Sequence, residues 1–226
     1  MSKENKSIPN QPHSDAAEGI RIAALTNRIL GGDREALSEL FEVYRPRLWR
    51  MVTFRLHPCL QGRIDADDVL QDAWLQAVER MDHFYEADGS SSFLWFRSIV
   101  TQTLLQLHRF HIGTQKRNAA RELSMNSGWE AGSTSSCLAF HLSDSVLSPS
   151  SSASRAEVMK QIDVVLQGME ELDREVLALR HFESLTNGEV AKILNLTEQA
   201  ASVRYIRALG RLKMILEFAL PKPFEE

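Results

Sequence analysis

The basic side chains near the C-terminus are spaced so that they could hold an extended polyanion. Arg204, Arg207, Arg211 and Lys213 recur every two to four residues, and no Asp or Glu occurs between residues 199 and 216. Guanidinium and ammonium groups bind phosphate oxygens, and a run without acids does not repel a phosphate backbone. These four cations are therefore candidates for binding nucleic-acid phosphates.

The segment that carries them, residues 184–216, predicts two helices joined by a tight turn. Thr186 and Glu189 have the spacing of a capping box, and Asn195 tolerates the left-handed backbone that ends a helix. Thr197 can cap a second helix that runs to about residue 218. Apolar residues at three- and four-residue spacing mark the buried side of that helix: Ala201, Tyr205, Ala208, Leu212 and Ile215.

This pattern is typical of a helix-turn-helix. Its second helix would enter the DNA major groove, with the first residues on base edges and the arginines on phosphates. An antiparallel helix pair with a solvated basic face is the alternative that spacing alone leaves open. Val203 and Ile206 fall near the expected DNA face, so the boundary between the two faces of the helix also stays open.

Charge is segregated along the rest of the chain, although the net charge is only −4. Residues 61–88 hold eight acids against Arg63 and Arg80, whereas residues 89–121 hold no acid and five basic residues. Such segregation indicates one acidic surface and separate basic surfaces, and hence different partners. Ordinary solvated helix faces are the alternative.

The acidic segment predicts a helix that either Asp65 or Asp67 can cap, and the acids suit its positive N-terminal end. Leu75 is an apolar residue on the polar side of this helix, which indicates either a partner surface or a wide core stripe. Taken by itself, Leu75 favours the core stripe. Asp68 and Asp72 lie four residues apart and could together ligate a divalent metal. No matching His or carboxylate motif recurs elsewhere in the sequence, so we predict no metal site and no cofactor.

A second, aromatic helix is predicted from residue 90 to about residue 110. It carries Phe93, Trp95 and Phe96 and leads into the basic segment 109–121. Aromatic rings beside arginines can stack on single-stranded bases while the guanidinium groups hold the backbone. The alternative is that these rings belong to the core, and we expect this for at least two of the three.

Composition restricts the remaining possibilities. The chain has 226 residues, 43% of them hydrophobic. It contains no apolar run of the ~20 residues that span a membrane. Its first residues lack the apolar core of a secretion signal. We therefore expect a cytoplasmic protein that does not contact membranes. Cys59 and Cys137 lack the paired spacing of a zinc site and are expected to be reduced thiols.

Two further local expectations concern Pro46 and the connector. Pro46 is expected in the first turn of a third helix, because proline is favoured there. Residues 123–154 contain twelve serines and no Lys or Arg, which is typical of a flexible linker.

Four stretches, in this order, resemble bacterial RNA polymerase sigma factors of the sigma-70 family, extracytoplasmic-function (ECF) group. They are GDREALSELFEVYRPRL, DADDVLQDAWLQAVERMDHF, SFLWFRSIVTQTLL with HRFHIGTQKR, and LDREVLALRHFESLTNGEVAKILNLTEQAASVRYIRALGRL. Together they cover most of residues 25–121 and 155–216, and the second and fourth are the most specific.

The resemblance implies an all-α fold of two small helical domains joined by a flexible linker. The expected organisation is a disordered tail (1–16), a sigma2-like domain (17–122), the serine-rich linker (123–154), a sigma4-like helix-turn-helix domain (155–220) and a C-terminal tail (221–226).

The resemblance also implies three sets of binding residues. The set expected to bind core polymerase comprises Asp67, Asp68, Val69, Leu70, Gln71, Asp72 and Leu75. The set expected to contact the −10 promoter element comprises Trp95, Arg97, Gln102, Arg109, Lys116 and Arg117. The set expected to contact the −35 element comprises Glu198, Gln199, Ala200, Ser202, Arg204, Arg207 and Arg211.

The implied function is that of a non-enzymatic promoter-specificity subunit. Its expected partners are core RNA polymerase, through the β′ clamp and the β flap, together with promoter DNA and a possible anti-sigma factor. Two alternatives come from other classes of protein. One is a helix-turn-helix regulator that does not bind core polymerase, and the other is a metal-dependent phosphohydrolase that uses the carboxylates of residues 65–72.

Overall fold

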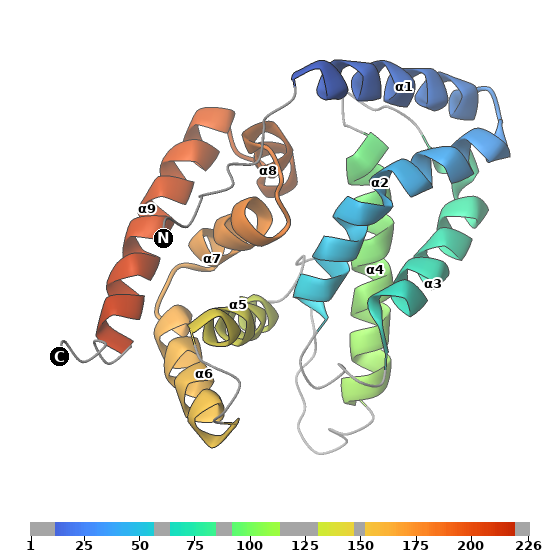
Figure 1. Cartoon of the computed structure of the whole chain (residues 1–226). Helices are drawn as coiled ribbons and strands as arrows, with labels where there is room; N and C mark the ends of the chain where they lie inside the picture. Colours follow the sequence, from blue (N-terminus) through green and yellow to red (C-terminus); the bar gives the residue numbers. More distant parts are fainter. Residues whose placement is uncertain (1–11, 57–63, 85–91, 114–130, 147–151, 220–226) are drawn as a thin grey trace, which may run out of the picture.

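The chain folds into two helical units with a further helix between them (Figure 1). The computed structural model describes residues 12–56, 64–84, 92–113, 131–146 and 152–219. The N-terminal unit comprises α1 (Pro12–Leu30), α2 (Arg34–Arg55), α3 (Ala66–Glu79), a 3-10 turn (Met81–His83) and α4 (Ser92–Gly113). After α5 (Ala131–Val146), the C-terminal unit comprises α6 (Ser152–Gln167), α7 (Glu171–Leu177), a π-helical turn (Ala178–Phe182), α8 (Asn187–Leu194) and α9 (Glu198–Ala219). The expected all-α class is confirmed.

Aromatic side chains fill the centre of the N-terminal unit, where α2, α3 and α4 meet. The ring of Phe41 packs against Trp74 and Phe96, with centroid distances of 5.2 and 5.5 Å. Tyr44 packs edge-on against Phe93 at 5.4 Å. Large rings buried at one junction contribute much apolar area and prefer tilted geometries, so they restrict how the three helices can cross.

Helix α2 is continuous through Pro46, so the predicted start of a third helix at that residue is wrong. Asp33 caps the helix, because its Oδ1 accepts the backbone N–H groups of Glu35 and Ala36 at 2.9 and 3.1 Å. Pro46 has no N–H to donate to the preceding turn. Buried leucines on both sides of it in the sequence, Leu40 and Leu48, keep the helix intact by packing on the core.

The local signals of the helix-turn-helix are confirmed. Thr186 Oγ1 accepts the N–H of Glu189 at 3.2 Å, and Glu189 Oε2 accepts the N–H of Thr186 at 2.8 Å, which completes the capping box of α8. Asn195 ends α8 with a φ of 53°. Thr197 Oγ1 then accepts the N–H of Ala200 at 3.1 Å at the start of α9. Each of these contacts lies within one turn of chain, which is why the sequence could predict them.

The linker expectation requires correction, because α5 lies inside residues 123–154. Leu138, Ala139 and Cys137 of this helix are buried, and α5 packs against α6, α7 and α2. The many serines of this segment made it look polar throughout, although its few apolar side chains share one face of the helix. That face stabilises α5 only when other helices cover it. Residues 114–130 and 147–151 lie outside the described part of the chain.

The two ends of the chain also differ in part from expectation. Helix α1 begins at Pro12, inside the tail that was expected to be disordered. Residues 1–11 and the predicted C-terminal tail lie outside the described residues.

Candidate functional site

The outward face of α3 is acidic and exposed. Asp67, Asp68, Gln71 and Asp72 are exposed, and Leu75 beside them is 57% exposed. Two of the acids already have local partners, because Asp68 completes the capping box of α3 with Asp65 and Asp67 binds Arg45 at 2.9 Å. Both ion-pair partners are exposed, so the pair is solvated and can exchange for another cation.

Two members of the predicted polymerase-binding set lie on the opposite side of α3. Val69 and Leu70 are buried in the core, because they fall on the face of the helix that packs on α2 and α4. Their predicted role in direct binding is therefore corrected: they hold α3 in place. Only the outward residues of the set are available to a partner.

Helix α4 exposes some of the predicted −10 residues and buries others. Gln102 and Arg109 are exposed, and Gln102 accepts a hydrogen bond from Arg80. Trp95 is half-buried and packs edge-on against Phe84 and Phe96, at centroid distances of 4.9 Å in both cases. Lys116 and Arg117 lie outside the described residues.

The aromatic rings of α4 belong to the core, as expected for at least two of them. Phe93 and Phe96 are buried, and Trp95 packs against the core without being fully covered. Burial leaves Phe93 and Phe96 unable to stack on a base in this arrangement. The core explanation is thus confirmed for Phe93 and Phe96.

Arg97, predicted to contact DNA, is instead buried between the two units. Its Nε donates to Glu183 Oε2 at 3.0 Å, and its Nη2 lies 2.9 Å from the same oxygen. Glu183 ends the π-helical turn of the C-terminal unit, 86 residues further along the chain. Sequence reasoning could not find this contact, because no local pattern marks a pairing at that separation.

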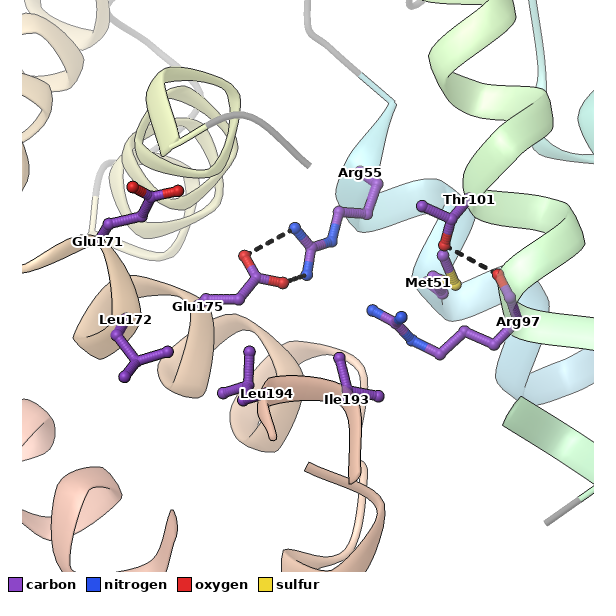
Figure 2. A pocket seen from close by; sticks show the side chains of 9 residues that line it. All are labelled: Met51, Arg55, Arg97, Thr101, Glu171, Leu172, Glu175, Ile193 and Leu194. Atoms are coloured by element: carbon purple, nitrogen blue, oxygen red, sulfur yellow. Dashed lines mark hydrogen bonds and ion pairs between the residues drawn. The ribbon is translucent and has the colours of Figure 1, made fainter. Parts of the chain in front are cut away.

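Arg55 is the centre of the same buried network. Its Nε donates to Glu183 Oε1 at 2.6 Å, its Nη2 and Nη1 donate to the two oxygens of Glu175 at 2.5 and 3.1 Å, and its Nη1 donates to Thr134 of α5 at 3.2 Å. Figure 2 shows Arg55 reaching from α2 toward Glu175 on α7, with Arg97 beside it on α4. One arginine of the N-terminal unit thus contacts α7, the π-helical turn and α5 together.

Burial disfavours the charges in this network, and the opposite charges beside them compensate for it. Burial alone would raise the pKa of Glu183, but the positive charges of Arg55 and Arg97 outweigh it and hold that pKa below its ordinary value. Burial also acts against the charge of Arg55, and the carboxylates of Glu175 and Glu183 more than compensate, so the pKa of Arg55 is raised. Glu183 and Arg55 therefore both carry their charges at neutral pH.

A second contact joins the units next to the helix-turn-helix. Arg47 of α2 donates to Glu189 at 2.9 Å, so the capping residue of α8 also binds the N-terminal unit. The guanidinium of Arg47 lies 3.7 Å from the centroid of the Phe93 ring, a favourable cation–π geometry. A cleft of about 460 Å³ lies beside the Arg55 network, and Arg55, Arg97 and Glu175 contribute to its lining. Figure 2 shows Ile193 and Leu194 of α8 on one side of it and Met51 and Thr101 on the other.

The predicted −35 residues divide into outward and flanking groups on α9. Glu198, Gln199, Ala200 and Arg207 are exposed, and Ser202 is partly covered. The remaining two arginines, Arg204 and Arg211, bind the carboxylate of Asp173 on α7.

The contacts of Arg204 and Arg211 are short and partly buried. Arg204 Nη1 lies 2.7 Å from Asp173 Oδ1, and Arg211 Nη1 lies 2.8 Å from Asp173 Oδ2. Asp173 itself has no exposed surface. Both residues thus hold α9 against α7 in this arrangement, while their side chains keep 24% and 38% exposure. Their contact with the −35 element stays a prediction.

Comparison with known families agrees with this layout. Residues 40–111 match the family model described as sigma-70 region 2, and residues 165–214 match that described as sigma-70, region 4. The two matches together cover more than half of the chain, in the order in which the two units occur. The chain belongs to the sigma-70 family of RNA polymerase sigma factors. It therefore binds core polymerase and directs it to promoters, and α2–α4 contain region 2 while α6–α9 contain region 4.

Similar proteins of known name support the ECF group. The ECF RNA polymerase sigma factor SigD of Mycobacterium tuberculosis is 26% identical over 196 residues, which cover 87% of this chain and 84% of SigD. The ECF RNA polymerase sigma factor BldN of Streptomyces coelicolor is 22% identical over 212 residues, covering 91% and 69%. The resemblance to ECF sigma factors is thus confirmed.

A solved structure shows the same fold. CnrH, solved in complex with the cytosolic domain of CnrY, has a TM-score of 0.51 and 20% identity to this sigma factor, over 88% of this chain and 98% of that one. Within the described residues, no helix combines the length and the apolar character needed to cross a bilayer. The same residues hold no group of three or more metal-ligating side chains that could bind an ion.

Proposed function

We propose that the outward face of α3 is the surface through which this sigma factor binds the β′ clamp of core polymerase. The exposed Asp67, Asp68 and Asp72 form an acidic surface around the apolar Leu75, which suits a basic partner with an apolar contact at its centre. Beside Leu75, a shallow depression of about 340 Å³ lies between α3 and α4. This depression offers space for a side chain of the partner.

The proposal for the −10 element rests on the exposed far half of α4. Gln102 and Arg109 point to solvent there, and the basic pair Lys116 and Arg117 follows in the sequence. Arg97 is held by Glu183 in this arrangement. Its contact with DNA therefore requires regions 2 and 4 to separate, and we propose that they do so when the sigma factor binds polymerase and promoter.

The proposal for the −35 element rests on the capped helix-turn-helix. Gln199 and Ala200 lie in the first turn of α9, where helices of this motif contact base edges, and Arg207 is exposed one turn beyond Val203. Arg204 and Arg211 support the position of α9 through Asp173. Their contribution to DNA binding is then indirect.

Further partners follow from the family. CnrH was solved with the cytosolic domain of CnrY, and we propose that an anti-sigma factor likewise controls this chain and that the β flap of polymerase binds region 4. We propose a cytoplasmic location, where the polymerase is. We also propose that the chain acts by binding alone, without catalysis or cofactor.

The observation that carries the proposal is the presence, in one chain, of an exposed acidic helix face in region 2 and a capped helix-turn-helix in region 4. The test is run-off transcription with core polymerase on a pool of genomic promoters, together with a binding assay. The combined substitutions Asp72→Arg and Leu75→Ser should abolish association with core polymerase and transcription. They leave the capping box of α3 intact, because Asp65 and Asp68 are unchanged.

A matched control carries the same kind of charge change elsewhere. Glu18→Arg with Glu157→Arg alters two exposed acids of α1 and α6 and should bind core polymerase as the wild type does. Unchanged binding by the α3 variant would refute the docking surface. DNA binding by the free wild-type chain, without any affinity for core polymerase, would instead favour a helix-turn-helix regulator.

A further inference from the structure

The most outward row of α9 is largely apolar. Gln199, Val203, Ile206 and Gly210 follow one another at spacings of four, three and four residues, so they share one face of the helix. Val203 is 51% exposed and Ile206 is 66% exposed. The opposite face packs inward through the buried residues Ala201, Ala208 and Leu212. This row is therefore what α9 presents to a partner that approaches it directly.

Gly210 indicates that a partner comes close to this face. Glycine in a helix interior costs about 0.5 to 1 kcal/mol relative to alanine. Nothing within the described structure requires a glycine here, because a Cβ added at this position would meet no atom within 4 Å. A missing side chain in the middle of an exposed row instead lets another molecule approach the helix backbone.

The surroundings of the row favour nucleic acid as that molecule. Arg207 follows Val203 by four residues and Lys213 follows Gly210 by three, and both are exposed. No acid occurs on α9 from Gln199 to Leu216. An apolar row edged by cations suits the major groove, where phosphates line the rim and the C5-methyl group of thymine is the apolar feature of the base edges.

We infer that Val203 and Ile206 are specificity-determining residues that contact the C5-methyl groups of thymines in the −35 element. This inference rests on the proposed function of α9. Cytosine has no such methyl group, so these contacts favour T·A over C·G at the positions concerned. Gln199, at the start of the same row, has the amide that pairs with the N6 and N7 atoms of adenine. The row thus predicts A·T pairs at the centre of the −35 element.

The test removes single methyl groups from the DNA. Holoenzyme made from core polymerase and this sigma factor is bound to a promoter found by run-off selection, with each −35 thymine replaced in turn by deoxyuridine. Loss of a methyl group that contacts Val203 or Ile206 should weaken binding about threefold to fourfold, the value expected for one buried methyl. Thymines outside the −35 and −10 elements should be insensitive to the same replacement.

Substitutions then assign each methyl group to its side chain. Val203→Ala and Ile206→Ala should each weaken binding to the thymine promoter, and in each variant one deoxyuridine replacement that mattered in the wild type should become neutral. Val164→Ala is the matched control, because Val164 is an equally exposed apolar residue on α6 of the same unit. That control should bind every promoter as the wild type does.

Three results would overturn the inference, and they differ from failure of the proposed function. If a scrambled −35 element does not weaken binding at all, the proposed function of α9 fails. If the element matters but no deoxyuridine replacement does, the methyl contact fails. If Val203→Ala and Ile206→Ala weaken binding equally on promoters with and without a −35 element, the row docks on polymerase instead of DNA.

Discussion

Asp173 illustrates how one buried carboxylate decides the role of two arginines. It has no exposed surface, and each of its oxygens binds an arginine of α9. Arg204 also lies 2.8 Å from Glu170 and lowers the pKa of that exposed carboxyl through its hydrogen bond. Arg207, on the same helix, remains exposed. Neighbouring arginines in one basic run thus divide into two that bind a carboxylate of α7 and one, Arg207, that is exposed.

Substitution of these arginines should be strongly non-additive in stability. Arg204→Ala should lower the free energy of unfolding by about 1 kcal/mol or less, because Arg211 still holds Asp173. The double variant with Arg211→Ala should lose on the order of 3 kcal/mol, because a buried carboxylate is then left without a partner. Urea denaturation measures both values. Additive losses would show that Asp173 is solvated when either arginine is removed.

Arg207→Ala should behave in the opposite way. We expect its stability to stay within about 0.5 kcal/mol of the wild type, as for other exposed residues. Its effect should fall on DNA, as a decrease of about one in the slope of log affinity against log salt concentration for −35 binding. An unchanged salt slope would show that the Arg207 guanidinium does not contact a phosphate.

At the scale of elements, α5 changes the interpretation of the connector. A serine-rich stretch without cations is typical of a flexible linker, yet residues 131–146 form a helix whose apolar side chains are buried. Thr134 of this helix donates to Glu175 at 2.9 Å and accepts a hydrogen bond from Arg55 at 3.2 Å. The middle of the connector is therefore part of the packed structure.

Leu138→Ala tests the packing of α5. Leu138 has no exposed surface, so its truncation should lower the free energy of unfolding by about 2 to 5 kcal/mol, the range for leucines in packed cores. Val164→Ala on α6, which is exposed, should change stability by less than about 0.5 kcal/mol. Chemical denaturation of both variants makes the comparison. Equal stability of the two variants would indicate that α5 is not packed and that residues 123–154 form a flexible linker.

At the scale of the whole molecule, regions 2 and 4 are joined by ion pairs and by α5. Arg55 and Arg97 of region 2 share Glu183, and Arg47 binds Glu189. Cys137 of α5 lies in the same interface, because its thiol is 3.7 Å from the carbonyl oxygen of Arg55. Burial raises the pKa of Cys137 to about 12, so the thiol is protonated and unreactive at neutral pH. Cys137 is thus a chemical reporter of this interface.

Glu183→Gln should open the interface and expose Cys137. Without the carboxylate, Arg97 loses its charged partner and Arg55 loses one of its two carboxylate partners, so hydration of both guanidinium groups becomes more favourable. In a Cys59→Ser background, alkylation of Cys137 by iodoacetamide should be faster by on the order of tenfold or more, with unchanged helix content by circular dichroism. Glu157→Gln, at an exposed position of α6, is the matched control and should leave the rate unchanged. An unchanged rate in the Glu183 variant would mean that apolar packing alone holds the regions together.

Acid should have the same effect as this substitution. The pKa of Glu183 is lowered in the folded protein, so its ionised carboxylate stabilises the interface. This stabilisation is complete above the pKa of about 4.3 that a glutamate has in the unfolded chain. It is lost as the pH falls through the lower pKa of the folded protein. Small-angle scattering of the wild type should show expansion beginning below about pH 4. The Glu183→Gln variant should be expanded already at neutral pH. If this variant expands in acid as much as the wild type does, protonation of Glu183 is not what opens the interface.

The sequence alone determined the features that depend on neighbouring residues. The capping box of Thr186 and Glu189, the left-handed Asn195 and the outward acids of α3 follow from contacts within one or two helical turns. Their energies are local, so residue type and spacing are enough to predict them. The order of the same segments also allowed the family to be recognised.

Only the tertiary structure decided which of the predicted residues are free to bind. Arg97 is occupied by a carboxylate 86 residues away, Arg211 by one 38 residues away, and Val69 is covered by the core. Burial and long-range ion pairing depend on which surfaces meet when helices pack, and the periodicity of one helix shows only that it has a polar and an apolar side. For the same physical reason, α5 could be recognised as a packed helix only after α2, α6 and α7 were in place around it.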